Sequence, residues 1–266
     1  PFDNPTALSE GMKAEVRSAL AEWAKVANLK FVEVTDTGTS SGVLRFGLSG
    51  DVDKQGAAGY ATIPWSNSER AGDVWLSPTI FGGLNSVQHG TYYYGTLIHE
   101  IGHALGLSHP FRSDQDPIDR AALPASQDHY SYSTMSYTAE WNWKERHLDK
   151  GLWYDARGST PMLLDIQAIQ YLYGTNKTAA SGSDVYKLDP AALNYMSIWD
   201  TAGIDTISAS LFKTGSTINL GSGEFSTISE IYANGKTFTS GSGAIANRPL
   251  DNISIAKGVV IENAIG

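Results

Sequence analysis

The chain has 266 residues, 19 lysines and arginines against 28 aspartates and glutamates, a formal net charge of −9, 41% hydrophobic residues and no cysteine. The absence of cysteine excludes disulfides, thiol nucleophiles and thiolate metal sites, and the hydrophobic fraction excludes a disordered chain. The acidic balance and the lack of a long apolar run argue against nucleic acid or a membrane as the main partner, because the first needs clustered cations and the second needs about 20 apolar residues per spanning helix.

The first third of the sequence predicts one helix followed by a small sheet. Apolar residues recur at three- and four-residue spacing over residues 9–27, which is typical of an amphipathic helix, and Ser9 or Thr6 can cap its start. Short β-rich runs follow, separated by turn residues. These predicted strands cover residues 31–34, 43–48, 60–63 and 74–76.

Two further helices and a β-rich tail complete the predicted fold. One helix covers residues 91–105 and ends at Gly106, because glycine readily adopts a left-handed conformation. Residues 107–158 have no clear periodicity, and a third helix covers residues 161–173, with Thr160 as its cap and Pro161 in its first position. The predicted strands of the tail are 196–199, 206–207, 217–220, 253–255 and 259–261. We therefore expect an α+β protein with one domain over residues 1–174 and a β-rich segment over residues 175–266.

Residues 99–109 read HEIGHALGLSH, a pattern that gathers three histidines around one cation. His99 and His103 are four residues apart on a helix, so their side chains leave one face about 5–6 Å apart. Gly106 lets the chain turn back, which makes His109 a third ligand. Three imidazoles leave one coordination position for water, as in catalytic zinc sites, and Glu100 can reach that water as the general base. The alternative, ordinary helix histidines, is disfavoured by the presence of Gly106 and His109.

The eleven-residue pattern is the signature of the metzincin metalloproteases, and the sequence STMSY at 133–137 resembles the methionine turn of their serralysin branch. The resemblance implies a twisted mixed sheet with an active-site helix, followed by a short all-β segment like the beginning of a β-roll domain. It implies that Met135 forms an apolar floor beneath zinc. It also implies that Tyr137 binds zinc in the resting enzyme and hydrogen-bonds the oxyanion in the transition state. On their own, Met135 and Tyr137 would indicate core packing.

The same resemblance implies a substrate-binding strand. Val74, Trp75 and Leu76 resemble the edge strand that lies above the zinc and pairs with an extended substrate.

Calcium is the second metal that the resemblance implies. Asp200, Asp205 and Glu262 resemble calcium ligands of the family, with backbone carbonyl groups at Gly203 and Val260 completing the shell. From spacing alone, solvated turn residues are the alternative, because aspartates are common in turns. The glycine-rich nonapeptides of the family's calcium-binding roll do not occur before Gly266. We therefore expect either an excised core or a naturally short relative.

The sequence thus predicts a secreted, extracellular zinc endopeptidase of broad specificity. We expect it to be a monomer that acts on proteins or peptides, and the resemblance adds a small protein inhibitor as a partner. Two alternatives are a catalytically inactive, calcium-dependent binding or secretion module, and a protease of another metzincin branch, such as a matrixin-like enzyme. The intact zinc motif disfavours the first alternative, and the STMSY turn with the β-rich tail disfavours the second.

The remaining histidines and the loop aromatics receive no catalytic role. His89, His129 and His147 have no ligand spacing. The aromatic group at Trp141, Trp143, Trp153 and Tyr154 is interpreted as loop anchors rather than as a substrate pocket.

Overall fold

The computed structural model describes residues 5–35, 42–112, 122–139, 144–146, 153–213, 215–228, 238–240, 243–245 and 251–266. The helices are α1 Glu10–Val26, α2 Gly50–Lys54, α3 Pro78–Phe81, α4 Tyr92–Ala104 and α5 Leu163–Tyr173. The strands are β1 Phe46–Leu48, β2 Gly59–Ala61, β3 Val74–Leu76, β4 Lys144–Arg146, β5 Trp153–Asp155, β6 Val185–Lys187, β7 Met196–Ile198, β8 Thr206–Ser208, β9 Phe225–Ser226, β10 Phe238–Ser240, β11 Gly243–Ile245, β12 Ile253–Ile255 and β13 Asn263–Ile265. Within these ranges, every helix is too short or too polar to cross a membrane.

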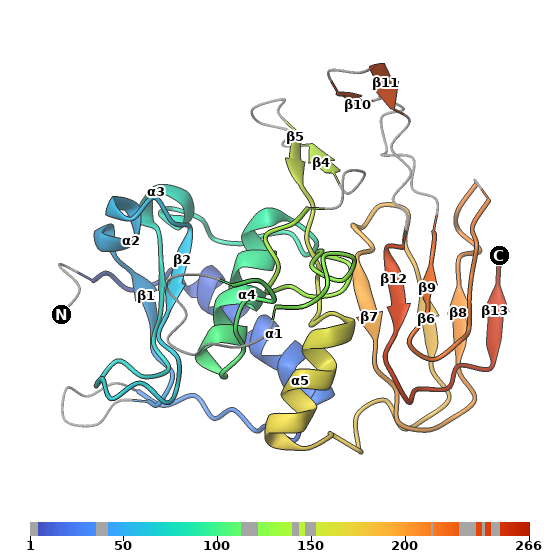
Figure 1. Ribbon diagram of the computed structural model, residues 1–266, viewed down its shortest axis with the longest axis horizontal. Coiled ribbons are helices and arrows are strands. Elements are labelled where there is room, and N and C mark those ends of the chain that lie inside the picture. Colours follow the sequence, from blue (N-terminus) through green and yellow to red (C-terminus); the bar gives the residue numbers. More distant parts are fainter. Residues whose placement is uncertain are drawn as a thin grey trace.

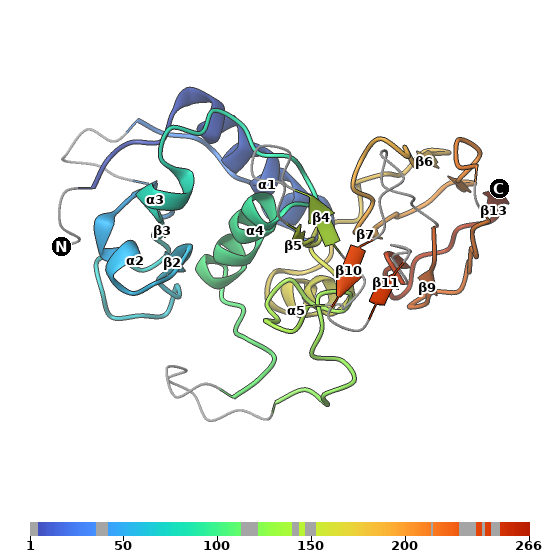
Figure 2. The same ribbon diagram turned by 90° about the horizontal axis from the view of Figure 1, so that it is seen from above.

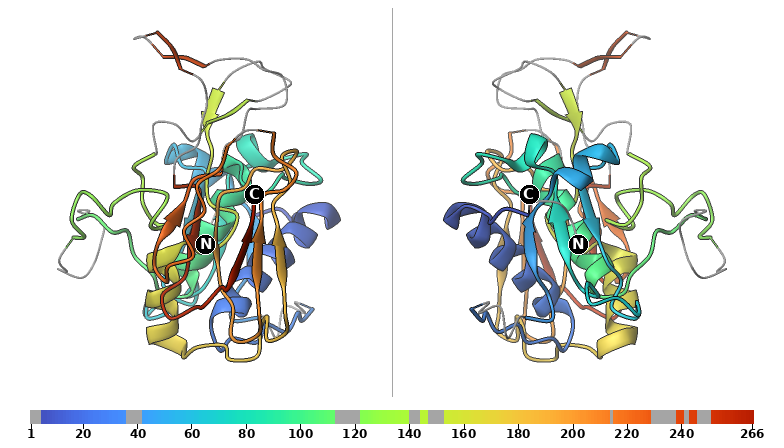
Figure 3. Two further views of the ribbon diagram at one scale, coloured as in Figure 1. Left: turned by 90° about the vertical axis from the view of Figure 1, so that its right-hand side faces the viewer. Right: turned by 90° about the vertical axis from the view of Figure 1, so that its left-hand side faces the viewer.

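The helices and the strands of the tail occupy opposite ends of the molecule. Figure 1 shows α1 to α5 with the β1–β3 sheet on the left, and β6 to β9 with β12 and β13 on the right. The view from above places α1, α4 and α5 between the small sheet and the tail (Figure 2). The two hairpins β4–β5 and β10–β11 project from the same side of the molecule (Figures 1 and 3).

Helices α1 and α4 confirm two of the predicted helices, and of the two cap candidates for α1, Ser9 is the cap. Thr91, the predicted first residue of the second helix, is instead its cap. The Ser9 hydroxyl accepts from the backbone N–H of Met12, and the Thr91 hydroxyl accepts from that of Tyr94. The apolar face of α1 is buried, and its Trp23 donates an indole hydrogen bond to the carbonyl of Ile98 in α4, 3.3 Å away. The two helices therefore pack directly against each other.

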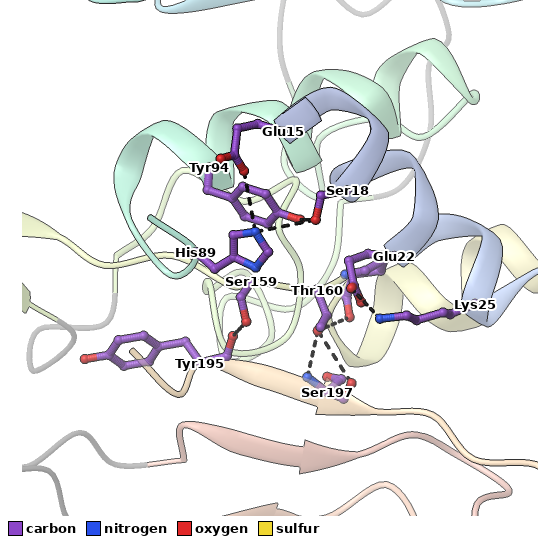
Figure 4. A network of polar contacts seen from close by, with 11 residues as sticks. Glu15, Ser18, Glu22, Lys25, His89, Tyr94, Ser159, Thr160, Tyr195 and Ser197 are labelled. Carbon is purple, nitrogen blue, oxygen red and sulfur yellow. Dashed lines mark hydrogen bonds and ion pairs between the residues drawn. The ribbon is translucent and has the colours of Figure 1, made fainter. Parts of the chain in front are cut away.

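A polar network at the outer end of this contact also joins the two helices. The His89 ring stacks on the Tyr94 ring with centroids 3.8 Å apart, and its Nε2 lies 3.6 Å from a carboxylate oxygen of Glu15 (Figure 4). The hydroxyl groups of Ser18 and Tyr94 are 3.2 Å apart. His89 thus has a packing role.

The small sheet differs from the prediction in its extent. Its strand order is β1-β3-β2, with β3 parallel to β1 and antiparallel to β2. The predicted strand over 31–34 is wrong: the segment has no strand, and Val32 and Val34 are exposed. Valine favours strands mainly where it packs on a half-buried surface, and the exposed valines of this segment have no such packing.

Helix α5 begins two residues later than predicted, and Thr160 does not cap it. The Thr160 hydroxyl instead accepts a 2.9 Å hydrogen bond from the backbone N–H of Ser197 in β7, which ties the start of this segment to the tail (Figure 4). The side chain of Asp165 accepts from the backbone N–H of Met162, in front of the helix. Gly174, with φ of 81°, ends the helix as predicted.

The tail forms two three-stranded sheets, in the orders β7-β12-β9 and β13-β8-β6. The pairs β7–β12, β8–β13 and β6–β8 are parallel. Residues 217–220 contribute only an isolated bridge from Thr217 to Thr227, and 259–261 is not a strand, although Val259 and Ile261 are buried. One hydrophobic cluster includes buried side chains of α1, α4, α5, β7, β8 and β12, so the described parts on both sides of residue 174 share a core. The domain boundary at residues 174 and 175 stays a prediction.

Candidate active site

Helix α4 and the turn after it carry three histidines. His99 and His103 lie one turn apart on α4, and His99 is buried. The chain reverses at Gly106, whose φ of 104° is a conformation that a side chain would strain. The backbone N–H of Leu107 then bonds back to the carbonyl of Gly102 at 2.9 Å, which returns the chain toward the helix.

Backbone carbonyl groups orient two of the imidazole rings. His99 Nδ1 lies 2.8 Å from the carbonyl oxygen of Thr134, and His103 Nδ1 lies 2.9 Å from that of Leu107. Because a carbonyl oxygen can only accept, each Nδ1 carries the proton and each Nε2 carries a lone pair. This tautomer is the one that binds a metal through Nε2.

The three histidines fit a zinc ion. Each offers a ring nitrogen, and these atoms all lie within 4.8 Å of one another. The Nε2 atoms of His103 and His109 are 3.1 Å apart. Zinc–nitrogen bonds of about 2.0–2.1 Å in a tetrahedron separate the nitrogens by roughly 3.3 Å. Burial lowers the pKa of His99 well below its usual range, which keeps the ring neutral, as a metal ligand must be.

Glu100 is buried beside this group and next to β2. A Cβ atom added to Gly59 of β2 would lie 2.7 Å from Oε1 of Glu100, so the strand passes directly over the carboxylate. Burial raises the pKa of Glu100 to about 8, against a smaller lowering by the positive charge of Arg157. A cation beside this buried carboxyl group would stabilise its ionised form, and the three histidines could supply that cation by binding zinc.

Met135 packs beneath the histidine-bearing helix. It is buried, and a Cβ atom added to Gly102 would lie 2.6 Å from its sulfur atom. The glycine between the two helical histidines therefore permits this close approach. That Met135 forms a floor beneath zinc stays a prediction.

Asp165 of α5 holds the loop that carries Met135. Its carboxylate accepts hydrogen bonds from the Ser133 hydroxyl at 2.6 Å and from the backbone N–H and hydroxyl of Thr134 at 2.7 and 2.8 Å. The carbonyl of the same Thr134 binds His99 Nδ1. Asp165 therefore positions the His99 ring through one intervening residue. The sequence analysis missed this role, because its only signal was one acidic residue in a helix.

Tyr137 is more than half exposed and lies among the aromatic rings of the site. Its ring centroid is 5.6 Å from that of His99, 4.6 Å from that of His109 and 5.1 Å from that of Phe111. Partial burial raises the pKa of Tyr137, so its phenol keeps its proton at neutral pH. The hydroxyl can therefore act as a hydrogen-bond donor beside the metal.

The predicted edge strand is not at the edge. Val74 and Leu76 are fully buried, and β3, which also holds Trp75, is paired on both sides, with β1 and with β2. Its backbone cannot pair with a substrate, so this part of the prediction is wrong. Among the described strands, β2 is the outer strand next to α4 and Glu100. The prediction chose the wrong strand because three short strands do not reveal their order in sequence.

A second group of carboxylates lies in the tail. Ligand oxygens of Asp184, Asp200 and Asp205 lie within 4.8 Å of one another. The backbone N–H of Asp205 donates a 2.8 Å bond to Glu262. A hollow beside them is lined by Asp200, Thr201, Ala202, Gly203, Gly258, Val260 and Glu262. The structure thus brings the five predicted calcium residues together and adds Asp184, whose position before a strand gave no signal.

Two groups named in the sequence analysis fall partly outside the structure. Trp141, Trp143 and His147 lie outside the described residues, and for Trp153 and Tyr154 only the backbone strand β5 is described. The interpretation of these aromatics as loop anchors stays a prediction.

Comparison with known proteins matches both parts of the chain. The family model for matrixin matches residues 3–118, and the one for the peptidase M10 serralysin C terminal matches residues 162–266. Serralysin of Proteus mirabilis is 31% identical over 99% of this chain and 53% of its own length. Serralysin C of Dickeya chrysanthemi is 35% identical over 95% of this chain and 50% of its own length. Metalloprotease AprA of Pseudomonas entomophila is 34% identical over 97% of this chain and 52% of its own length. The chain spans about half the length of these relatives.

Proposed function

This chain belongs to the serralysin-type metzincin metalloproteases, and we propose that it is a zinc-dependent endopeptidase that hydrolyses internal peptide bonds of proteins. The observation that carries the proposal is the convergence of three metal-binding nitrogens beside a buried carboxylate. His99, His103 and His109 would hold the zinc ion. When bound, zinc supplies a Lewis acid that activates water and polarises the scissile carbonyl.

Glu100 and Tyr137 carry the remaining chemistry. The Glu100 carboxylate takes a proton from the attacking water as the new C–O bond forms. It then gives this proton to the amide nitrogen as the C–N bond breaks, so the products are a carboxylic acid and an amine. The Tyr137 hydroxyl donates a hydrogen bond to the carbonyl oxygen as negative charge develops there. The protonated phenol and the position of the ring beside both His99 and His109 support this role.

The substrate would bind as an added strand along β2. This strand is the outer one of its sheet and passes over Glu100, which supports the assignment. Backbone hydrogen bonds between enzyme and substrate do not depend on the substrate's side chains, which supports a broad substrate specificity.

Replacing Glu100 tests the proposed reaction. Glu100→Ala should keep the fold and the zinc content and lower casein hydrolysis by orders of magnitude, because the proton carrier is lost. Glu10→Gln is the matched control, since Glu10 is an exposed acid that pairs with Lys13 on α1. Retained hydrolysis in zinc-loaded Glu100→Ala would overturn the mechanism. Hydrolysis absent from the zinc-loaded unmodified chain would favour the inactive binding or secretion module.

We also propose that calcium binds the carboxylate group of the tail. Asp200, Asp205 and Glu262, with the carbonyl groups of Gly203 and Val260, line or adjoin one hollow, and calcium prefers six to eight oxygen ligands. Asp184 extends this set. Calcium at 100 times its dissociation constant should stabilise the fold by about 2.7 kcal/mol. Asp205→Asn should reduce the calcium-dependent rise in melting temperature, and Glu224→Gln, an exposed acid in the same part of the chain, should not. Equal rises in both variants would refute the site.

Secretion to the extracellular space, a monomeric state and binding of a small protein inhibitor complete the proposal. A chain without cysteine needs neither disulfide formation nor protection of thiols outside the cell. Sedimentation of the purified protein tests the monomeric state, and an excess of a second species of twice the mass would contradict it.

A further inference from the structure

Arg157 lies against the helix that carries the zinc ligands. Its backbone N–H donates a 2.9 Å hydrogen bond to the carbonyl of Gly90, just before α4. A Cβ atom added to Gly95 would lie 2.4 Å from Cβ and 2.7 Å from Cδ of Arg157. Gly95 is one helical turn before His99 on α4. The arginine side chain is therefore packed along the helix, next to the catalytic centre.

Two tyrosine rings fix the guanidinium of Arg157. Its central carbon lies 4.7 Å from the ring centroid of Tyr92 and 4.6 Å from that of Tyr130, within the range of cation–π contacts. Tyr92 is the first residue of α4. The backbone N–H of Tyr130 bonds to the carbonyl of Thr138, next to Tyr137, so Tyr130 closes the base of the methionine-turn loop. The guanidinium thus lies between the two segments that flank the zinc ligands.

The guanidinium of Arg157 has one unused hydrogen-bond donor. Its Nε is buried and has no hydrogen-bond partner among the described residues. Its charge reaches the catalytic centre through space, since it lowers the pKa values of Glu100 and His99. A guanidinium that packs against two aromatic rings and has an unused Nε donor is suited to bind a carboxylate, a pairing that is frequently bidentate.

We propose that Arg157 is a specificity-determining residue that binds the side-chain carboxylate of an aspartate or glutamate flanking the scissile bond. The proposal rests on the endopeptidase function proposed above. Main-chain pairing along β2 admits many sequences, and Arg157 adds a preference at one position. The net charge of −9 disfavours acidic substrates as a class. A preference for an acidic side chain therefore depends on the positive charge of Arg157 at one position.

A different role is that Arg157 acts only through Glu100, by lowering its pKa. That role predicts equal effects on all substrates and a shifted pH profile. A carboxylate-binding role predicts an additional effect that is confined to acidic substrates. The two roles therefore separate in one experiment.

The test compares quenched fluorescent peptides that differ only in the residues on either side of the cleaved bond, which are glutamate, glutamine or leucine. The unmodified protein should cleave the glutamate peptides with a kcat/KM several-fold above the glutamine peptides, and high salt should reduce this ratio. Arg157→Gln should abolish the ratio, whatever change it makes to all peptides alike through the pKa of Glu100, and Arg157→Lys should retain part of it. Arg17→Gln, which removes an exposed arginine paired with Glu33, is the matched control.

Three results would overturn the proposal. The first is an unmodified protein without any preference for glutamate, which decides the matter even if the variants fail to fold. The second is an equal loss for all peptides in zinc-loaded Arg157→Gln together with a shifted pH profile, because Arg157 would then act through Glu100. The third is an unchanged ratio in Arg157→Gln. Failure of the protein to cleave casein at all would instead refute the endopeptidase function.

Discussion

Glu100→Gln should stabilise the zinc-free protein at pH 8, although it removes the residue proposed to be essential for hydrolysis. Burial raises the pKa of Glu100 from an ordinary value of 4.5 to about 8. Between these two values the folded chain keeps the proton and the unfolded chain loses it. The folded state therefore loses stability as the pH rises through this window. At pH 8 the penalty is about 4 kcal/mol, since each pKa unit is worth about 1.36 kcal/mol.

Glutamine removes this penalty and keeps the shape of the protonated carboxyl group. The free energies of unfolding of the two proteins should differ by about 1 kcal/mol at pH 5 and by about 4 kcal/mol at pH 8, with Glu100→Gln the more stable. Urea unfolding at pH 5, 6, 7 and 8 measures the difference, with 1,10-phenanthroline to remove zinc and calcium kept constant. Other titrating groups cancel in this difference.

The outcome with zinc provides the control. Adding zinc should shrink or reverse the difference at pH 8, because the ion favours the ionised Glu100 of the unmodified protein. A difference that is constant from pH 5 to 8 in the zinc-free proteins would refute the argument that burial penalises the Glu100 carboxylate.

Three further predictions concern the support of the zinc ligands. His109→Ala should weaken zinc binding by roughly 100-fold or more, measured by competition with a chelator, because a direct ligand should exceed the 10- to 100-fold effect of an outer partner; zinc affinity within a few-fold of normal would exclude His109 as a ligand. Asp165→Ala should lower the free energy of unfolding by about 3 kcal/mol, because it leaves buried donors of Ser133 and Thr134 without an acceptor. It should also weaken zinc binding, because the carbonyl of Thr134 orients His99. Unchanged zinc affinity would show that Asp165 does not position His99. Gly106→Ala should cost about 1–3 kcal/mol by urea unfolding, since its φ of 104° strains any side chain and its Cβ would meet the Trp65 ring at 2.6 Å; an unchanged midpoint would contradict this.

Local patterns predicted the parts of the fold that depend on neighbours in sequence. Helix α1 and its cap follow from apolar spacing and from Ser9, and the gathering of His99, His103 and His109 follows from one helical turn and one glycine. The start of α5 was misplaced, because Thr160 bonds to a strand almost 40 residues away. Rules based on neighbouring residues cannot predict a hydrogen bond to a residue so distant in sequence.

The order of the small sheet and the neighbours of the site lay beyond the sequence for the same reason. Three-residue strands carry too little alternation to show which of them is central, so β3 was assigned an edge that belongs to β2. Arg157 and Asp184 have no motif, and only the folded chain shows what lies beside them.

The bond between Asp165 and the methionine-turn loop bears on how this protein could be recombined with its relatives. Asp165 lies in the stretch that carries the tail, whereas His99 lies in the stretch that carries the active-site helix. A chimera joined at residue 161 would take Asp165 from one parent and Ser133 and Thr134 from the other. Exchange of the tail therefore also exchanges a support of the His99 ring, and a junction after residue 174 keeps that support within one parent.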